Sequence, residues 1–485
     1  MDMDKEPTIN LERVDEYRYR LVKDGNMRVN GIVYANDKII KDIGKDQSLQ
    51  QVANVATLPG IVRASLAMPD IHEGYGFPIG GVAAFDESGV ISPGGVGYDI
   101  NCGVRVMRSN LRHEEVSGLI RELVNTLFRN IPTGVGSRRK DLKLGRTELE
   151  SLLKKGAEWA VSQGYGRQKD LAHIEEAGCI RGADPAEVSH KALERGRAQV
   201  GTLGAGNHFV EIDLISEVYD EELARVLGLE AGGIAIQVHT GSRGLGYQVC
   251  DDFIAVMIAA AKKYGIDLPD RQLCCAPLDS EEGERYFAAM ACAANFAFAN
   301  RQMITHWVRE SFSRVLGKSS EELGLDLVYD VCHNIAKFED HTVDGRPMRL
   351  CVHRKGATRA LPPGHPQTPE AYKSVGQPVL IPGDMGRHSY VLVGTEAAST
   401  ETFASSCHGA GRLMSRTRAA KTVRGKDIVK AMQELGVVVK AAGWRTLAEE
   451  IPEAYKDVTE VVDVVHNAGI ARKVVQLRPL GVIKG

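Results

Sequence analysis

Two kinds of segment alternate along this chain, as shown by the spacing of its hydrophobic and polar residues. Residues 111–200 and 251–325 are rich in charge, and their apolar residues recur at helical spacing. The clearest examples are 114–129, 148–163 and the alanine-rich run 286–301. We therefore expect helices to dominate both segments.

Glycine-rich stretches with short apolar runs lie between and after these helical segments. Runs such as Gly-Val-Ala-Ala-Phe, Ile-Ala-Ile-Gln-Val and Tyr-Val-Leu-Val are typical of buried strands that end in tight loops. The stretches are 80–107, 200–215, 232–246, 327–335 and 379–394, and the tail returns to helical spacing at 425–435 and 458–468.

The chain shows no internal repeat and no low-complexity linker that would divide it. We therefore predict an α+β fold: one compact catalytic domain over residues 1–485, with β-sheets surrounded by helices. Residues 111–200 and 251–325 would be helical insertions in that domain.

Composition narrows the class of protein without identifying it. With 485 residues, 43% hydrophobic residues and a net charge of −3, the chain can build a large core but has no general positive coat for nucleic acid. Any RNA contact must come from a local basic patch.

The N-terminus lacks an apolar signal segment, and the apolar run 253–261 falls short of the ~20 residues of a membrane span. We therefore expect no membrane span. Scattered cysteines without Cys-x-x-Cys favour a reducing cytoplasm.

Five segments place a potential metal ligand inside or just after an apolar run bordered by glycine. Asp99 and Cys102 are three residues apart, so a turn would let both bind neighbouring ions, and a thiolate can bridge two cations. A single buried histidine such as His239 is usually a core residue, so the prediction rests on recurrence. Cys, His and Asp together indicate a divalent transition metal, and affinity alone would favour zinc over manganese. The segments are 97–103, 204–211, 237–244, 330–334 and 405–411.

His408 stands apart because Gly-Ala-Gly follows it and leaves both its imidazole and the following N–H groups accessible. A neutral histidine can attack phosphorus and carry a nucleotidyl group as a covalent intermediate. A fifth metal ligand or an ordinary loop histidine would fit the same residues. Sequence chemistry alone leaves these alternatives open.

Basic residues near His408 indicate an anion-binding surface. Arg412 and Arg416 are four residues apart and would share one face of a helix, in a basic run that continues to Lys430. Arg195, Arg197 and Arg243 are further candidates for contacts with RNA phosphates.

Familiar nucleotide motifs fail when they are compared with the chain. Phe312 stands where a P-loop ending in Leu-Gly-Lys-Ser would need its first glycine. The ligase signature Lys-x-Asp-Gly is also absent, since Val343 precedes Asp344-Gly345. The absence of a nucleotidylation lysine favours histidine as the carrier.

Taken together, these segments resemble the RtcB family of RNA ligases from about residue 68 to residue 485. Several ordered matches of this length make chance similarity very improbable. The matching segments are Met-Pro-Asp-Ile-His-Glu-Gly-Tyr-Gly-Phe-Pro-Ile-Gly-Gly (68–81), Asp-Ile-Asn-Cys-Gly-Val-Arg (99–105), Gly-Thr-Leu-Gly-Ala-Gly-Asn-His-Phe-Val-Glu (201–211), Val-His-Thr-Gly-Ser-Arg-Gly (238–244), His-Asn-Ile-Ala (333–336), Val-His-Arg-Lys-Gly-Ala-Thr-Arg (352–359) and Ser-Cys-His-Gly-Ala-Gly-Arg (406–412).

The resemblance implies a GTP- and manganese-dependent ligase that joins RNA 2′,3′-cyclic phosphate or 3′-phosphate ends to 5′-hydroxyl ends, in tRNA splicing or RNA repair. His408 would accept GMP from GTP and pass it to the RNA 3′-phosphate. One Mn²⁺ would be bound by Asp99, Cys102 and His208, and the second by Cys102, His239 and His333. The implied nucleotide contacts are Asn207, His208, Phe209, Val210, Glu211, His333, Asn334, Pro382, Gly383, Asp384, Met385, Ser389, His408, Gly409, Ala410, Gly411 and Lys484.

The resemblance also implies binding partners, and it leaves three alternative functions open. The partners are RNA ends and an archease-like activator, with the protein a monomer or weak homo-oligomer. Where the family commonly has Pro-Gly-Ser/Thr-Met-Gly-Thr, this chain has Pro-Gly-Asp-Met-Gly-Arg (382–387), so a paralogue with altered end specificity is one alternative. A metal-dependent RNA-end phosphatase or cyclic phosphodiesterase is a second, and a non-catalytic RNA-binding scaffold is a third.

Overall fold

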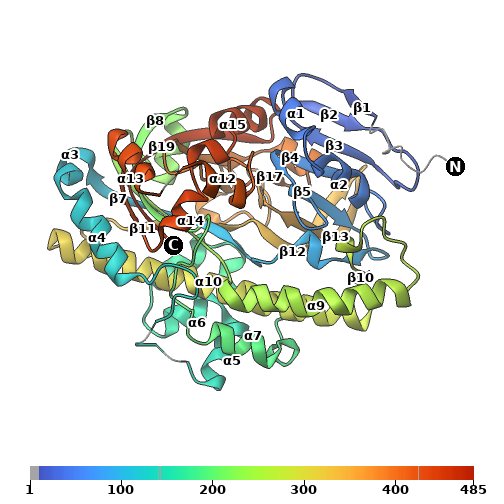
Figure 1. Cartoon of the computed structure of the whole chain (residues 1–485), viewed down its shortest axis with the longest axis horizontal. Coiled ribbons are helices and arrows are strands. Elements are labelled where there is room, and N and C mark those ends of the chain that lie inside the picture. The colour runs from blue at the N-terminus through green and yellow to red at the C-terminus, as the bar shows by residue number, and fades with distance from the viewer. Residues whose placement is uncertain (1–9, 140, 143, 424) are drawn as a thin grey trace.

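Two β-sheets with helices around them form the structure, a computed structural model (Figure 1). It describes the chain except residues 1–9, 140, 143 and 424. The N-terminal segment and Arg424 of the basic run therefore lie outside the described residues. The predicted α+β class is confirmed.

The first sheet brings the N-terminal strands next to a long hairpin from the second half of the chain. Asp344 and Gly345, with φ of 49° and 78°, form the tight turn of that hairpin, as an Asp-Gly pair favours. All its strand pairs are antiparallel except β3 and β4. In spatial order the strands are β1 (Leu11–Arg13), β2 (Arg18–Leu21), β3 (Asn30–Tyr34), β4 (Ala64–His72), β5 (Ile79–Phe85), β13 (Arg346–Lys355) and β12 (Asn334–Val343).

The second sheet curls until β15 at one edge packs against β7 and β11 at the other. Its C-terminal strand β19 runs through the middle of the sheet, so the chain ends inside the molecule (Figure 1). In order the strands are β11 (Asp326–Cys332), β7 (Gly103–Arg112), β9 (Gly233–Thr240), β8 (Phe209–Val218), β19 (Ala471–Lys484), β16 (Ser389–Gly394) and β15 (Pro378–Ile381), with β18 (Val438–Ala441) parallel to β19. Two short pairs complete the strands: β14 (Ala357–Arg359) with β17 (Ser405–Cys407), and β6 (Val90–Ile91) with β10 (Ala276–Pro277).

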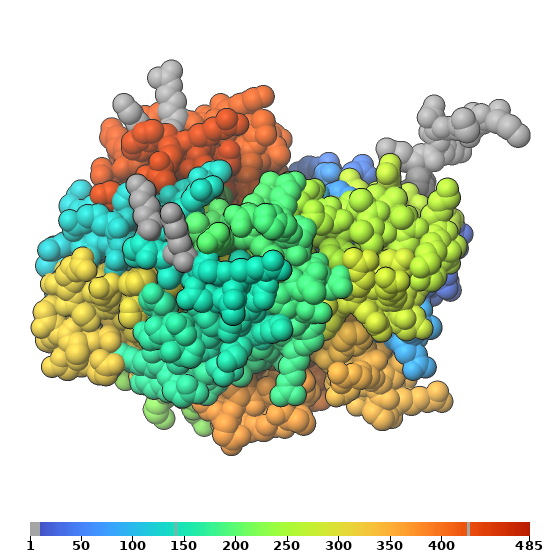
Figure 2. Space-filling model, turned by 90° about the horizontal axis from the view of Figure 1, so that it is seen from below, coloured from blue at the N-terminus to red at the C-terminus, as the bar shows by residue number. Residues whose placement is uncertain are grey.

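The long helices α9 (Arg243–Lys263) and α10 (Glu281–Leu316) run side by side under the sheets (Figure 1). α10 is buried by α4 (Ile120–Asn130), α5 (Arg146–Lys155), α6 (Ala157–Ser162) and α9, which explains its alanine-rich sequence. From below, the teal and green part of the chain that contains α5, α6 and α7 (His190–Gly196) covers the middle of the face, beside the lime-green end of α9 (Figure 2).

The remaining helices are short. They are α1 (Asp37–Ile43), α2 (Ser48–Val55), α3 (His113–Val116), α8 (Glu221–Leu227), α11 (Glu396–Glu401), α12 (Arg416–Thr422), α13 (Gly425–Glu434), α14 (Trp444–Ala448) and α15 (Val458–Asn467). The 3-10 turns are Pro93–Gly95, Ser117–Leu119, Gln168–His173, Glu175–Gly178, Pro185–Glu187, Arg271–Leu273, Glu370–Tyr372 and Pro452–Ala454.

Two predicted helices are interrupted. The run 148–163 breaks at Gly156, whose φ of 57° brings it so close to Gly178 that an added Cβ would lie 2.1 Å from the carbonyl oxygen. The run 114–129 contains a 3-10 turn at Ser117–Leu119. Periodicity located the buried faces of these helices but not the tertiary contact that breaks one of them.

One helix in the described part of the chain, α9, is long and apolar enough to cross a membrane by length and composition. Half of the apolar stretch of α9 is buried inside the protein, where α9 packs on α7 and α10. Core helices of ordinary globular proteins can be equally long and apolar. The burial of α9 therefore explains its apolar sequence.

Candidate active site

The Cys102 thiol lies at the centre of a cluster of imidazoles. Its Sγ is 3.5 Å from Nε2 of His208 and 3.3 Å from Nε2 of His239. Nε2 of His239 is in turn 3.4 Å from Nε2 of His333, and Nε2 of His208 is 2.9 Å from Oδ2 of Asp99. The structure thus groups these residues as two three-donor sets that share one thiol.

Four adjacent strands of the second sheet bring these donors together. His239 is in β9 opposite Val104 of β7 and Phe209 of β8, and His208 immediately precedes Phe209. His333 directly follows β11, which pairs with β7. The register of one sheet edge therefore sets the spacing between donors that are far apart in sequence.

A tight turn holds Asp99 and Cys102 together, as their three-residue spacing suggested. The N–H of Cys102 donates to the Asp99 carbonyl at 2.9 Å, and Asn101 between them has a φ of 52°. Arg301 of α10 donates to the carbonyls of Asn101 and of Thr240, next to His239. One buried guanidinium thus ties the ligand turn to the end of β9.

The electrostatics of the cluster suit a cation. Burial lowers the pKa of both His239 and His333 well below the usual value, so both rings are neutral, with Nε2 atoms facing each other. Burial raises the pKa of Cys102, which favours the thiol unless a positive charge is present. Burial also acts to raise the pKa of Asp99, but the hydrogen bond from His208 outweighs it and lowers that pKa. Neutral imidazoles, a carboxylate and an ionisable thiol aimed at common points fit divalent metal ions.

His408 follows the short strand β17 and is oriented by Asp70 of β4. Nδ1 of His408 donates to Oδ2 of Asp70 at 2.5 Å, and the same oxygen accepts the backbone N–H groups of His408 at 2.9 Å and of Gly409 at 3.2 Å. The imidazole lies edge-on to His333, with ring centroids 4.8 Å apart. With Nδ1 engaged, Nε2 is the nitrogen of His408 free to act as a nucleophile.

Sequence analysis missed Asp70 as a functional residue. Burial would raise the pKa of its carboxyl, but His408 outweighs that effect and lowers it. Asp70 lies in the Met-Pro-Asp-Ile-His segment that carried part of the family resemblance, and a carboxylate inside a nearly wholly buried strand was the available signal.

A cavity of about 740 Å³ joins the cluster to His408. Most of the predicted site residues line it, although they come from segments spread over nearly the whole chain. They are Asp99, Cys102, Asn207, Phe209, Glu211, His239, His333, Asn334, Pro382, Gly383, Asp384, Met385, His408, Gly409, Ala410, Gly411, Arg412, Arg416 and Lys484.

Three predicted residues lie just behind this lining. Nε2 of His208 lies within the cluster, 3.5 Å from Sγ of Cys102 and 2.9 Å from Oδ2 of Asp99, and its Nδ1 faces the Leu203 carbonyl at 3.0 Å. Val210 is buried in β8. Ser389 is buried and accepts the N–H of Gly383 at 3.0 Å, so it supports the 382–385 turn from behind.

The basic side of the cavity differs from the prediction. Arg412 and Arg416 do not share a helix face, because α12 begins at Arg416 and Arg412 precedes it in a loop. They converge instead on the buried carboxylate of Glu450, at 3.2 Å and 3.5 Å, and Lys484 lies 3.8 Å from it. Tyr455 also donates to Glu450. Sequence analysis missed Glu450, because the counter-charge comes from a different segment of the chain.

Arg195, Arg197 and Arg243 are not among the cavity-lining residues in the described part of the chain. Arg195 is exposed on α7, and Arg197 donates to the Leu144 carbonyl at 2.7 Å on another surface. Arg243 begins α9 with a φ of 55° and donates to the Thr202 hydroxyl at 3.2 Å. Of the three, Arg243 is nearest the cluster, since its positive charge acts on Asp99.

A pair of buried carboxyl groups lies beside Lys484 at one end of the cavity. Burial and then the charge of Asp213 raise the pKa of Glu211 well above its usual value, and burial raises the pKa of Asp213 to about 6. Gln237 donates to Asp213 at 2.9 Å. Of the two acids, Glu211 is the one that reaches the cavity.

Asp384, the unusual residue of the 382–387 turn, is nearly fully buried. Its Oδ1 accepts the Gly386 N–H at 2.9 Å, and Arg387 lies 3.5 Å from its Oδ2. Burial nevertheless raises its pKa. Arg387, a candidate to offset this charge, also donates to the Lys456 carbonyl at 2.9 Å, so the substituted pair is tied into the fold.

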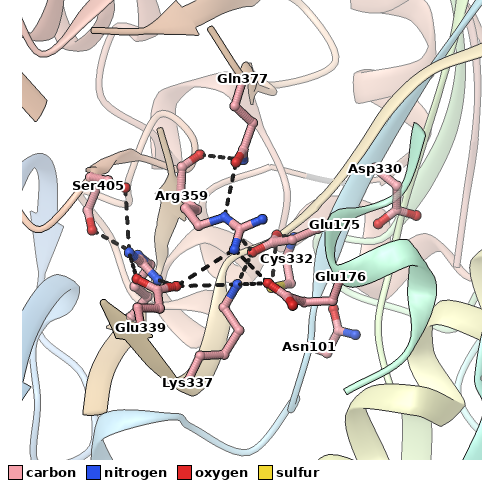
Figure 3. Close-up of polar contacts among 12 residues, drawn as sticks. Asn101, Glu175, Glu176, Asp330, Cys332, Lys337, Glu339, Arg359, Gln377 and Ser405 are labelled. Atoms are coloured by element: carbon pink, nitrogen blue, oxygen red, sulfur yellow. Dashed lines mark hydrogen bonds and ion pairs between the residues drawn. The ribbon is translucent and has the colours of Figure 1, made fainter. Parts of the chain in front are cut away.

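A buried ion-pair cluster lies beside Cys332 (Figure 3). Glu175 accepts the N–H of Cys332, the residue before His333, at 2.9 Å, and pairs with Lys337. Lys337 also approaches Glu339 at 3.4 Å. Arg354 and Arg359 complete the cluster, donating to Glu339 and Glu176 respectively. These contacts fix the chain where β11 passes into β12.

Comparison with known families identifies the family of the chain. The family model described as tRNA-splicing ligase RtcB matches residues 51–485, and the chain therefore belongs to the RtcB family. The resemblance drawn from its motifs is thereby confirmed.

Several curated relatives are similar over nearly their whole length, and each is described as tRNA-splicing ligase RtcB. The relative from Thermococcus kodakarensis is 56% identical over 479 residues, which is 98% of this chain and 99% of the relative. The relative from Archaeoglobus fulgidus is 55% identical over 478 residues, with the same coverage. The relative from Nanoarchaeum equitans is 49% identical over 479 residues, covering 98% of this chain and all of the relative.

Proposed function

We propose that this chain is a GTP-dependent RNA ligase that joins 2′,3′-cyclic phosphate or 3′-phosphate ends to 5′-hydroxyl ends, in tRNA splicing or RNA repair. The observation that carries the proposal is the Asp70–His408 pair beside the two donor sets that share Cys102. Membership of a family described as tRNA-splicing ligases supports the substrate class.

His408 would act as the covalent carrier. Its Nε2 attacks the α-phosphorus of GTP, the bond to the β-phosphate breaks, and pyrophosphate leaves. A terminal oxygen of the RNA 3′-phosphate then attacks the same phosphorus, and the P–N bond breaks to restore His408. A cyclic phosphate is first opened by water to the 3′-phosphate. Asp70 keeps Nδ1 protonated, so the lone pair stays on Nε2.

The final step joins the strands. The RNA 5′-hydroxyl oxygen attacks the phosphorus of the activated 3′-phosphate, GMP leaves as its P–O bond breaks, and the hydroxyl proton passes to solvent. The backbone N–H groups after His408 and the cations Arg412, Arg416 and Lys484 surround the cavity in which the phosphates would lie.

Two Mn²⁺ ions would be bound by Asp99, Cys102 and His208 and by Cys102, His239 and His333, and would polarise phosphoryl oxygens. The ionised form of Glu211 would accept the N1–H and N2 amine of guanine. Asn207, Phe209, Asn334 and the 382–385 turn would complete the nucleotide contacts.

The setting proposed for the enzyme is the cytoplasm, with RNA ends as substrates, an archease-like protein as activator, and a monomer or weak homo-oligomer as the active form. A single catalytic domain over residues 1–485, with helical insertions at 111–200 and 251–325, would carry the activity.

A joining assay with defined ends tests the function. We expect joining of 2′,3′-cyclic phosphate or 3′-phosphate ends to 5′-hydroxyl ends, and acid-labile label on the protein from α-labelled GTP with Mn²⁺. Joining only of 3′-hydroxyl to 5′-phosphate ends would contradict the proposal. The 382–387 substitution makes a paralogue with a different end preference the second candidate, and the same panel of ends measures that preference.

A metal-dependent RNA-end phosphatase or cyclic phosphodiesterase would use the same donor sets without nucleotide. The Asp70–His408 pair has no role in that chemistry, which favours the ligase. Release of phosphate from RNA ends by His408→Ala at the wild-type rate, without label from GTP on the wild-type protein, would establish the hydrolase instead.

A further inference from the structure

Three tyrosine rings lead from the cavity to the protein surface. Tyr75 and Tyr98 line the cavity, with ring centroids 5.6 Å apart in an edge-on arrangement. Tyr247 of α9 stacks on Tyr98 with centroids 4.9 Å apart and an interplanar angle of 24°. The guanidinium of Arg195 from α7 lies 5.9 Å from the centroid of Tyr247.

These three tyrosines differ in exposure from the tyrosines of the hydrophobic core. Tyr286 and Tyr329 are fully buried, whereas Tyr247 keeps 48% of its surface exposed. Arg195 is also exposed and has no carboxylate within ion-pair distance in the described residues, while its neighbour Arg197 lies 3.8 Å from Glu194. The stacked rings of Tyr98 and Tyr247, with the Arg195 guanidinium next to Tyr247, therefore lie between the cavity and solvent.

Its position ties the group to the candidate metal centre. Tyr98 immediately precedes Asp99, whose carboxylate is 2.9 Å from Nε2 of His208. Oδ1 of Asp99 accepts the N–H of Ser242 at 3.1 Å, one residue before α9, so the start of the helix that carries Tyr247 is fixed to the same turn. Whatever stacks on these rings is held next to the reacting centre.

Unpaired nucleic-acid bases have the chemistry that this surface recognises. Proteins bind single-stranded RNA by stacking bases on tyrosine rings and on guanidinium planes, without a requirement for one base. The exposed arginine adds attraction for the phosphate backbone. Neither a buried metal centre nor a nucleotide cavity by itself requires a stacked aromatic pair at its mouth.

We propose that Tyr98, Tyr247 and Arg195 form a stacking platform that holds an unpaired base of an RNA end beside the metal centre. The inference rests on the proposed ligase function, since it assigns the substrate strand of that reaction. Arg195, which sequence analysis expected to contact phosphate, acts here mainly as the outer wall of the platform. The platform would select unpaired over base-paired ends and tolerate any base.

The experiment measures binding of short single-stranded RNAs to the full-length protein by fluorescence anisotropy, without nucleotide. One RNA carries a 5′-hydroxyl and the other a 3′-phosphate, and each is made with a normal or an abasic terminal nucleotide. We expect Tyr247→Ala to weaken binding of at least one normal RNA about tenfold, and Tyr247→Phe to leave it unchanged. The arm that loses affinity identifies the end that uses the platform.

The abasic RNAs give the decisive comparison. If a base stacks on Tyr247, removal of that base and Tyr247→Ala are not additive, so abasic RNA binds the wild type and the variant equally. Arg195→Ala should weaken binding of the same RNA. It leaves the buried packing untouched because Arg195 is exposed. Tyr264→Ala, at the other end of α9 with a similar 38% exposure, is the matched control and should change nothing.

Two outcomes would overturn the platform: equal weakening of normal and abasic RNA by Tyr247→Ala, or no change in either arm. A thermal-unfolding measurement on each variant separates loss of stacking from loss of folding. Labelling of the wild type by α-labelled GTP is scored in parallel. Its failure would reject the ligase function, whereas the binding arms, which need no nucleotide, reject or support the platform independently.

Discussion

The Asp70 carboxylate accepts a hydrogen bond from Nδ1 of His408 at 2.5 Å, although 338 positions separate the two residues. The same oxygen also accepts the backbone N–H of His408, so ring and backbone are fixed together. This relationship distinguishes His408 from the three histidines of the Cys102 cluster, since Nδ1 of His208 faces a backbone carbonyl and Nδ1 of His239 and of His333 has no hydrogen-bond partner among the described residues.

Asp70→Asn should slow covalent labelling of His408 by α-labelled GTP about 100-fold, because the amide no longer stabilises the positive charge that develops on the imidazole. His408→Ala should abolish the label. Asp340→Asn, on an exposed carboxylate, is the control and should label normally. Normal labelling of Asp70→Asn would show that the carboxylate only packs the loop.

The shared thiol predicts how metal binding responds to substitution. Cys102→Ala should remove both Mn²⁺ sites in a calorimetric titration, because both donor sets contain Cys102. His208→Ala and His333→Ala should each weaken a different one of the two sites. Cys179→Ala, on a thiol outside the cluster, should leave the stoichiometry intact. Equal losses from His208→Ala and Cys102→Ala would contradict a shared ligand.

The carboxyl pair predicts a pH effect on nucleotide binding. Burial and Asp213 raise the pKa of Glu211, so the ionised form needed by guanine is reached only at higher pH. Asp213→Asn removes the repulsion and should move the acid limb of GTP affinity about one unit lower, as measured by calorimetry across pH. An acid limb that stays in place, or moves upward, would show that Glu211 does not set the affinity.

Lys337→Met should destabilise the fold by about 3–5 kcal/mol, because it leaves the carboxylates of Glu175 and Glu339 buried with one cation fewer (Figure 3). Denaturant unfolding measures this loss. Lys318→Met, at an exposed position, should stay within about 0.5 kcal/mol of the wild type. A comparable loss from Lys318→Met would show that the effect is not specific to the buried cluster.

The buried carboxylate of Asp170 should make the free energy of unfolding depend on pH in the acid range. Burial acts to raise the pKa of its carboxyl, but the hydrogen bonds and charge of Arg309 outweigh burial and lower it to about 2. A depressed carboxyl pKa stabilises the folded state above the unfolded value of 3.8 and loses that effect as pH falls toward 2. The lowering from 3.8 corresponds to about 2.5 kcal/mol.

Urea unfolding of Asp170→Asn checks this. The variant should be less stable than the wild type at pH 7, and the gap should narrow as the pH falls from about 4 toward 2. A gap that stays constant over that range would show that packing, and not ionisation, accounts for the loss.

The sequence by itself singled out the candidate site residues and predicted the buried faces of several helices and strands. Apolar spacing located α10 and strands such as β5, β9 and β16, because side-chain periodicity follows directly from backbone geometry. Glycine-bordered runs marked Cys102 and His408, because tight loops at strand ends leave local signatures. Family motifs then grouped those residues.

Only the tertiary structure decided which of these residues meet. Asp70 reaches His408, and Glu450 reaches Arg412, across hundreds or tens of positions, and no local pattern encodes either contact. The expected Arg412–Arg416 helix face failed for the same reason: the helix starts at Arg416, and the two side chains are joined by a carboxylate from another segment. Local sequence fixes the period and the buried side of each element, whereas pairing between distant elements is set by packing of the whole core.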